Sequence, residues 1–413
     1  MTSPNPTGQT PYRQPISSTT WPTRRYGKLG GMNSTRLISP PRPLSLSGRP
    51  LGAVGRVRMY VCGITPYDVT HLGHASTYLW ADLADRVLTW QGHTVTVARN
   101  ITDVDDVLFA EAQRRGESAT MLAAMQRASF EATMTSLRVR TPDHQPSAAQ
   151  AIGHVVQLAA ALLAHDRAYL RDGSVYARTS HAAAAVDLDE ATAIALATEY
   201  RDGPDDPRKD HPLDVAVWRA TTNGASTIDH PEVSWPSPWG PGRPGWHAEC
   251  AAMVLALYGP SVDLHCGGAD LAFPHHACES ALAEGATGVT PFARAWLRAG
   301  TVQLDGTKMA KSAGNLVLVD QLLHDYPAAA VRLLCLNRPW AQPWSYTGAA
   351  LDEAAGLLDQ LYHAAGKPDA GTAVESSVAD VLLTDLDVPA AIALAVEHGG
   401  STARMVIDVL ALS

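Results

Sequence analysis

The first well-defined apolar pattern begins near Arg56. Residues 57–61 form a β-rich run that ends at Cys62 and Gly63, which indicates a strand followed by a turn. Residues 77–90 carry leucines and valines near helical spacing, and residues 93–99 alternate as a second strand. Because a strand, a helix and another strand in this order form a βαβ unit, the pattern predicts a parallel sheet in an α/β fold.

The remainder of the chain divides into segments of different character. Residues 103–170 are predicted to be predominantly helical, and residues 180–210 to form a loop-rich insertion rich in Asp, Gly and Pro. A strand-and-turn zone at 215–244 precedes helices predicted at 246–257 and 276–284. We therefore expect a Rossmann-like nucleotide-binding core at 51–312 with a helical insertion at about 103–210, then a short C-terminal helical domain at 313–413.

Residues 1–50 differ in composition from the rest. They contain no Asp or Glu and many Ser, Thr, Pro and Gly, so they are interpreted as a flexible leader that buries no core. An acid-free leader containing arginine can resemble a transit peptide, but the Pro and Gly interruptions disfavour an amphipathic helix. Met32 offers an internal start codon.

Composition narrows the function classes. Hydrophobic residues make up 46% and charged residues 18% of the 413 residues, which is typical of a globular protein. The formal charge of -9 weakens the expectation of sequence-independent nucleic-acid binding, and no apolar run is long enough to span a membrane. Five cysteines, an odd number and widely spaced, indicate a reducing cytoplasm and thiol or metal chemistry.

Two segments are suited to handling phosphates. Residues 70–75 (THLGHA) lie between the first strand and the first helix, where a glycine lets the backbone approach a phosphate while His71 and His74 contact its oxygens. Residues 305–312 (DGTKMAKS) carry Lys308 and Lys311 on a glycine-bearing loop that can close over pyrophosphate. Taken singly, each could be a solvated surface turn, but their order and context favour a shared role.

A third group of residues offers metal ligands. Cys62, Cys250, His275 and Glu279 supply sulfur, imidazole and carboxylate, and the last two are four residues apart, hence on one face of a helix. Such ligands suit Zn²⁺. Because the spacing is not a compact CxxC pattern, buried structural cysteines remain the alternative from spacing alone.

Several long segments resemble known proteins in one order. Residues 59–75 (MYVCGITPYDVTHLGHA), 99–106 (RNITDVDD), 212–214, 242–250 (GRPGWHAEC) and 308–312 (KMAKS) resemble the motifs of cysteinyl-tRNA synthetases of class I. The wording of residues 65–75, 234–247 and 314–319 is more similar to the ligases that join cysteine to glucosaminyl-inositol in mycothiol biosynthesis. The 101 residues after Ser312 also leave little room for an anticodon-reading domain.

The resemblance implies a class I synthetase (HUP) core and a role for each matching residue. It makes Cys62, Cys250 and His275 ligands of one Zn²⁺, with Glu279 undecided, and it places His71, His74, Lys308 and Lys311 around the phosphates of ATP and its Mg²⁺. The cysteinyl-adenylate pocket would then be lined by Cys62, Gly63, Ile64, Thr65, Thr77, Asn100, Ile101, Thr102, Trp246, Gly268, Ala269, Asp270 and Val302.

The implied reaction has two halves. Cysteine is activated with ATP to cysteinyl-AMP and is then transferred to the amine of glucosaminyl-inositol as an amide. The chain departs from the ligase pattern at residues 199–204, at Ala277 and Cys278, and at residues 337–345. The alternatives are therefore a cysteinyl-tRNA synthetase or a paralogous cysteine ligase with another amine acceptor. We expect L-cysteine, ATP and an amino sugar as partners, without tRNA or a membrane, and a cytoplasmic monomer.

Overall fold

A parallel four-stranded sheet organises the chain. The computed structural model describes residues 42–67, 69–221, 233–309, 314–369 and 371–413. The strand order is β10-β9-β3-β4, with β3 (Arg56–Ile64) paired in parallel to β4 (Thr94–Ile101) and to β9 (Val262–Gly268), and β9 paired in parallel to β10 (Ala293–Ala299). The predicted parallel α/β sheet is therefore confirmed, with the first predicted strand at an inner position.

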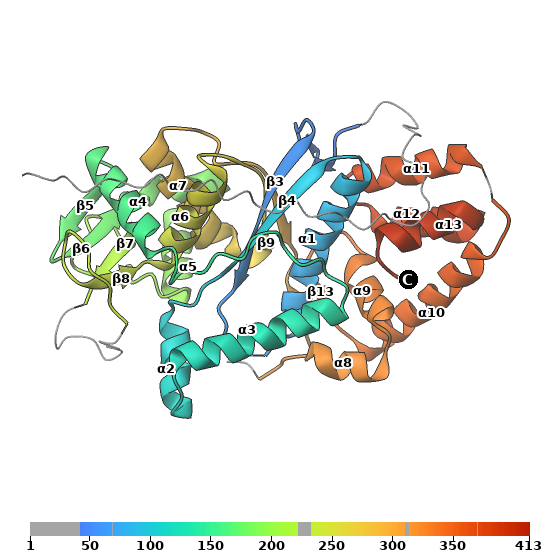
Figure 1. The fold of residues 1–413 in the computed structure, drawn as a ribbon, viewed down its shortest axis with the longest axis horizontal. Coiled ribbons are helices and arrows are strands. Elements are labelled where there is room, and N and C mark those ends of the chain that lie inside the picture. The colour runs from blue at the N-terminus through green and yellow to red at the C-terminus, as the bar shows by residue number, and fades with distance from the viewer. Residues whose placement is uncertain (1–41, 68, 222–232, 310–313, 370) are drawn as a thin grey trace, which may run out of the picture. The chain divides into compact units, whose positions relative to one another are not determined.

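Helix α1 (Leu72–Trp90) connects β3 to β4 (Figure 1). It begins five residues before the predicted start at Thr77, because His71 caps it: the Gly73 backbone N–H donates to His71 Nδ1 over 3.1 Å. The phosphate-type motif at residues 70–75 therefore forms the first turn of this helix, at the carboxyl end of the sheet.

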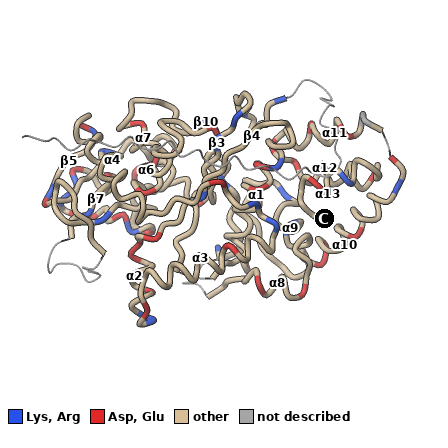
Figure 2. The backbone as a smooth tube through the Cα atoms, viewed as in Figure 1, with Lys and Arg blue, Asp and Glu red and all other residues tan. Residues whose placement is uncertain are grey.

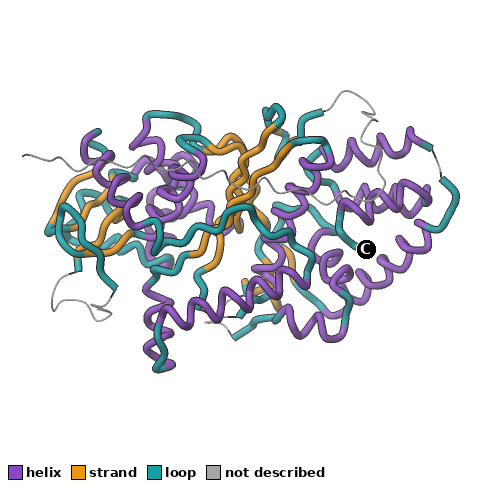
Figure 3. The backbone as a smooth tube through the Cα atoms, viewed as in Figure 1, coloured by secondary structure: helices purple, strands orange, loops and turns teal. Residues whose placement is uncertain are grey.

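A second sheet joins the predicted helical insertion to the predicted strand-and-turn zone at 215–244. Strands β5 (Ala168–Arg171), β6 (Ser174–Ala177), β7 (Val215–Ala220) and β8 (Gly242–Pro244) pair antiparallel in that order, and Figure 3 shows them as a separate group of strands. The prediction of a predominantly helical 103–170 is right for α2 (Asp106–Arg115), α3 (Ala119–Ser136) and α4 (Ile152–Ala164) but wrong at β5. The loop-rich prediction for 180–210 likewise omitted helix α5 (Glu190–Glu199).

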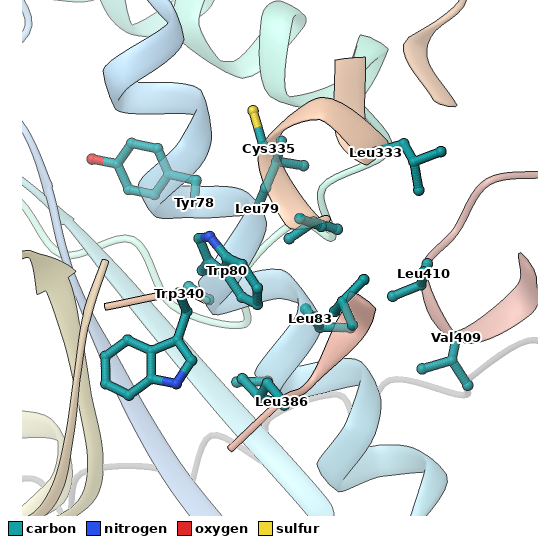
Figure 4. Packing of buried hydrophobic residues seen from close by; sticks show 14 of the residues in the cluster. Tyr78, Leu79, Trp80, Leu83, Leu333, Cys335, Trp340, Leu386, Val409 and Leu410 are labelled. Atoms are coloured by element: carbon teal, nitrogen blue, oxygen red, sulfur yellow. The ribbon is translucent and has the colours of Figure 1, made fainter. Parts of the chain in front are cut away.

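The helices after Ser312 extend the core of the sheet. One continuous apolar cluster includes Leu79 and Leu83 of α1, Leu333 of α9 (Ala328–Leu336), and Val409 and Leu410 at the C-terminal end. Figure 4 shows these side chains together. The C-terminal region is helical as predicted, apart from the short strand β13 (Trp344–Ser345), and its packing continues that of the sheet without a break.

The predicted leader is corrected at its end. Strands β1 (Ser45–Leu46) and β2 (Arg49–Pro50) form a hairpin, and Leu44, Leu46 and Leu51 are buried in the main core. The acid-free composition, rich in Ser, Thr, Pro and Gly, predicted no core here, yet these three leucines all pack into the apolar core. Residues 1–41 lie outside the described residues.

Basic and acidic residues are scattered together along the described chain (Figure 2). None of its helices is long and apolar enough to cross a membrane. The remaining elements are α2 (Asp106–Arg115), α3 (Ala119–Ser136), α4 (Ile152–Ala164), α6 (Trp246–Tyr258), α7 (Ala277–Thr287), β11 (Val302–Leu304), β12 (Thr307–Lys308), α8 (Val319–Asp325), α10 (Gly348–Ala365), α11 (Thr372–Leu383), α12 (Val388–His398) and α13 (Gly400–Val409), with short helical turns at Ser180–Ala182, Ala184–Val186, Ala269–Leu271 and Ala272–His276.

Candidate functional site

The predicted metal ligands meet beneath the carboxyl end of β3. Cys62 comes from that strand, Cys250 from α6, and His275 and Glu279 from the turn before α7 and its first residues. One ligand atom from each lies within 4.8 Å of the others, and all four residues are buried. Residues up to 217 positions apart in sequence therefore form a compact cluster of two sulfurs, an imidazole and a carboxylate.

The electrostatics of this cluster suit a bound cation. Burial, together with the hydrogen bond to Cys250, raises the pKa of the Cys62 thiol well above its usual value. Burial, followed by the charge of Cys250, raises the pKa of Glu279 well above its usual value, and Glu279 Oε1 has no hydrogen-bond partner. Such groups are costly to ionise without a counter-charge, which a divalent cation supplies. The donor set therefore fits a metal such as Zn²⁺.

Two further histidines border the cluster, and sequence reasoning assigned neither of them. His265 Nε2 lies 3.4 Å from Cys62 Sγ, and His276 completes a second possible ligand set with Cys62, His265 and Glu279. Burial lowers the pKa of His265 to about 3, so this ring is neutral. The set containing Cys250 offers two sulfurs instead of one and is the better match to zinc. His265 lies inside a buried strand, where no motif marks it.

The predicted pocket residues of β3 and β4 contact one another. The Gly63 N–H donates to Asn100 Oδ1 over 2.8 Å, the hydroxyls of Thr65 and Thr102 are 3.0 Å apart, and the Thr102 hydroxyl donates to the Ile64 carbonyl. A Cβ on Gly63 would lie 1.6 Å from the Asn100 carbonyl oxygen, so only glycine permits this approach. Ile101 ends β4 beside them.

Three of the remaining predicted pocket residues, together with Thr77 of α1, lie at the end of β9, and two others lie elsewhere. Gly268 ends the strand, and a Cβ there would lie 2.3 Å from Asp270 Oδ1 and 3.8 Å from the Thr77 hydroxyl of α1. Ala269 and Asp270 form the following turn. Trp246 stacks on the metal-cluster residue His275, with ring centroids 4.2 Å apart. Val302 begins β11, and its carbonyl accepts from the Met309 N–H.

The rings of the two histidines in residues 70–75 lie in contact, tilted against each other. The ring centroids of His71 and His74 are 3.8 Å apart, and burial, with His71 as the second cause, lowers the pKa of His74 to about 3. His74 is therefore neutral, as expected for a donor to phosphate oxygens. The segment after the lysine loop pairs with this motif, because the Leu72 N–H donates to the Val317 carbonyl.

Lys308, on β12, contacts Asp270, one of the predicted pocket residues. Its Nζ lies 2.6 Å from Asp270 Oδ2, and this pair is partly exposed. The Asn315 side chain donates to the Thr307 and Lys308 carbonyls, which fixes the backbone at the start of the loop. Lys311 lies outside the described residues, so its predicted role stays a prediction.

The segment 199–204, noted in the sequence only as a departure, contacts the site. The Tyr200 hydroxyl donates to the Asp270 carbonyl, and the Tyr200 ring stacks on Trp246. Asp202 contacts His247, which in turn contacts His275. An acidic residue in a loop gives no sequence signal that it will meet a histidine 45 residues away, so these contacts required the structure.

Comparison with known proteins identifies the family. A family described as "tRNA synthetases class I (C) catalytic domain" matches residues 50–356. The chain belongs to this family. One curated relative is the "L-cysteine:1D-myo-inositol 2-amino-2-deoxy-alpha-D-glucopyranoside ligase" of Parafrankia sp. It is 41% identical over 92% of this chain and 87% of the relative. The ligase of the same name from Mycolicibacterium vanbaalenii is 44% identical over 84% and 81%.

A solved structure shares the fold of this class I synthetase domain. Mycobacterium tuberculosis methionyl-tRNA synthetase, in complex with methionyl-adenylate, aligns with a TM-score of 0.58 over 87% of this chain and 82% of the other. The sequence identity is 16%, so the likeness shows the fold alone. The expectation of a class I synthetase nucleotide-binding core is confirmed.

Proposed function

We propose that this protein is an ATP-dependent ligase that activates L-cysteine as cysteinyl-AMP and transfers it to the amine of glucosaminyl-inositol. The observation that carries the proposal is the cluster of Cys62, Cys250, His275 and Glu279 beside the Gly63–Asn100 contact at the end of the parallel strands. A thiol-binding cation site next to a nucleotide site is what cysteine activation requires. The ligase name shared by relatives that are 41% and 44% identical to this chain supports glucosaminyl-inositol as the acceptor.

Cys62, Cys250 and His275 would hold one Zn²⁺, with Glu279 beside them. When bound, the zinc supplies a soft Lewis acid that favours the substrate thiolate over a hydroxyl. Serine therefore lacks the contact around which the pocket is built, and a site of that kind rejects such an analogue by roughly 10⁴-fold or more. No editing step is needed for this discrimination.

The first half-reaction depends on positioning. A carboxylate oxygen of cysteine attacks the α-phosphorus of ATP, the bond to the bridging oxygen breaks, and pyrophosphate leaves with Mg²⁺. His71 and His74 contact the phosphates, the buried His74 as a neutral group, while Lys308, with Lys311, neutralises the charge that develops on the departing pyrophosphate. The Thr65–Thr102 pair and the Gly63 backbone line the adenylate.

In the second half-reaction the unprotonated amine of the acceptor attacks the carbonyl carbon of the adenylate. The C–N bond forms, the bond to AMP breaks, and the product is an amide.

Five cysteines without a disulfide among them suit a reducing compartment, and we propose a cytoplasmic monomer.

Cysteine-dependent exchange of labelled pyrophosphate into ATP tests the first half-reaction. We expect exchange with cysteine and none with serine; the absence of exchange in protein supplied with zinc and magnesium would overturn the proposal. Glucosaminyl-inositol and tRNA, added in parallel with mass analysis of the products, then assign the acceptor. A cysteinyl ester of tRNA would favour the synthetase alternative, and an amide with neither would favour another amine.

A further inference from the structure

Three buried side chains form a hydrogen-bonded line that ends in the metal cluster. Asp202 Oδ2 lies 2.9 Å and Oδ1 3.0 Å from His247 Nε2, and His247 Nδ1 lies 2.9 Å from His275 Nδ1. The side chains of Asp202 and His247 are 6% and 2% exposed. Asp202 comes from the loop after α5 and the two histidines from α6 and the turn before α7, so the line joins three elements.

The chemistry of these groups fixes which nitrogens carry hydrogen. An ionised carboxylate only accepts, so His247 Nε2 carries the hydrogen that Asp202 receives. The 2.9 Å contact between His247 Nδ1 and His275 Nδ1 holds one hydrogen between two nitrogens, and with His247 Nδ1 as the acceptor it is His275 Nδ1 that carries it. This leaves the lone pair on His275 Nε2, the nitrogen that faces Glu279 Oε1 at 3.8 Å. It is the nitrogen that a cation in the cluster would bind.

Aromatic packing supports the His275 ring at the end of this line. Trp246 stacks on His275 with an interplanar angle of 24°, and Tyr200 stacks on Trp246 at 18°. The backbone of Asp202 is anchored independently of its carboxylate. The Asp202 N–H donates to the Ala197 carbonyl, and Lys209 Nζ donates to the Asp202 carbonyl over 2.6 Å. Removing the carboxylate should therefore leave the loop in place.

We propose that Asp202 is a positioning residue of the metal site: it acts through His247 to hold His275 in the tautomer whose Nε2 is free to bind the metal. The inference rests on the metal site of the proposed function and extends it to a loop that differs from the ligase pattern. A carboxylate that orients a metal-binding histidine typically improves metal affinity 10–100-fold. Here the carboxylate acts across an intervening imidazole, so one acidic side chain aligns two rings.

Metal-free protein labelled with ¹⁵N-histidine tests the tautomer directly by long-range ¹H–¹⁵N correlation, with His275 assigned by comparison with His275→Gln. We expect the hydrogen on Nδ1 of His275 in the unsubstituted protein and in Asp202→Asn, whose amide oxygen still accepts from His247, and a loss of this single tautomer in Asp202→Ala. A hydrogen on Nε2 of His275 in the unsubstituted protein would overturn the proposal.

Competition for zinc with a chromophoric chelator supplies the second measurement. We expect Asp202→Ala to raise the zinc Kd about 10–100-fold and Asp202→Asn to stay within about threefold. The matched control is Asp205→Ala, which removes an exposed carboxylate of the same loop and should change nothing. Equal losses in Asp202→Asn and Asp202→Ala, or zinc binding by Asp202→Ala like that of the control, would contradict the positioning role.

The failure of this inference is distinguishable from failure of the metal site itself. If Cys62→Ala also retains zinc affinity, the cluster is not the metal site and the proposed function is at fault. If Cys62→Ala loses zinc while Asp202→Ala keeps both zinc and the His275 tautomer, only the positioning role is wrong. Should Asp202→Ala not fold, the comparison of Asp202→Asn with the unsubstituted protein still tests whether an uncharged acceptor suffices.

Discussion

Lys308 of β12 and Asp270 of the turn after β9 form an ion pair, with Nζ 2.6 Å from Oδ2. Burial opposes the charge on Lys308, but Asp270 and Tyr200 outweigh it and raise its pKa. In this arrangement Lys308 is charged and lies beside a residue of the predicted adenylate pocket. In the proposed mechanism it would exchange this anionic partner for the leaving pyrophosphate.

Replacement of Lys308 should therefore slow adenylation much more than it weakens cysteine binding. We expect Lys308→Ala to lower kcat of cysteine-dependent pyrophosphate exchange by about 10²–10³-fold, as for loss of one transition-state donor, with a small change in KM for cysteine. Lys367→Ala, which removes an exposed lysine of the C-terminal helices, is the control and should leave exchange unchanged. A rate for Lys308→Ala within threefold of the control would contradict this role.

Replacing a cysteine of the cluster should release the metal, whereas replacing a cysteine elsewhere in the chain should not. Cys62→Ala and Cys250→Ala are expected to lose the zinc and, with it, exchange activity, because each removes a sulfur from the cluster. Cys335→Ala is the matched control, since it removes a buried thiol of the apolar core. Metal content after gel filtration measures the outcome; zinc at about one per chain in either cluster variant would refute the ligand set.

A buried ion pair ties α1 to α9. Arg332 Nη2 lies 2.8 Å from Asp82 Oδ2, both side chains are 0% exposed, and Arg332 also donates to the Leu137 and Leu410 carbonyls. Asp82→Ala leaves a buried guanidinium without its counter-charge, so we expect a loss of about 3–5 kcal/mol in the free energy of unfolding, measured in urea. Arg404→Ala, which breaks the exposed Arg404–Asp369 pair, should cost no more than about 1 kcal/mol.

The same pair predicts a pH dependence. Burial opposes ionisation of Asp82, but Arg332 and Arg86 outweigh it and lower its pKa. A carboxyl whose folded pKa is depressed stabilises the fold above its unfolded pKa of about 3.9 and loses that contribution as the pH falls through the folded value. The difference in unfolding free energy between the unsubstituted protein and Asp82→Asn should thus be constant near neutrality and shrink below about pH 4. A difference that grows on acidification would contradict this sign.

Gly63 offers a steric test of the pocket. A methyl group there would overlap the Asn100 carbonyl, so Gly63→Ala should push β3 and β4 apart at their carboxyl ends, cost about 1–3 kcal/mol of stability and abolish exchange. Gly356→Ala is the opposite case, since this glycine lies inside α10 with open space around it, and it should stabilise the fold by up to about 1 kcal/mol. Thermal unfolding of both variants provides the comparison.

The sequence predicted the parts of the site that periodicity and motif order determine. The βαβ unit of β3, α1 and β4 follows from local apolar patterns, and the residues Cys62, Cys250, His275 and Glu279 meet as the family resemblance implies. Strands β7 and β8 lie in the predicted strand-and-turn zone, but β5, β6 and the pairing of the four strands were missed. Antiparallel pairing joins segments as far apart as Val175 and Trp218, and short strands leave little periodic signal.

The surroundings of the site were beyond sequence reasoning for a different reason. Asp202, His247 and His265 acquire their roles only from contacts between distant elements, and each one alone is an ordinary polar residue. Lys308 was predicted to face phosphate, yet its contact with Asp270 depends on how β12 and the turn after β9 come together. Local pattern identifies which residues can do chemistry, while the tertiary fold decides what orients them.

The hairpin of β1 and β2 sets a lower limit on how far the N-terminus can be shortened. The Ser47 N–H donates to Asp385 Oδ1, the Asp385 N–H donates to the Ser45 carbonyl, and Leu44 and Leu46 are buried beside them. Translation from Met32 would retain these contacts between the hairpin and Asp385. A start at Arg56 would remove them, along with about 1.5–3 kcal/mol for each lost leucine, and would leave the C-terminal helices with an uncovered apolar surface.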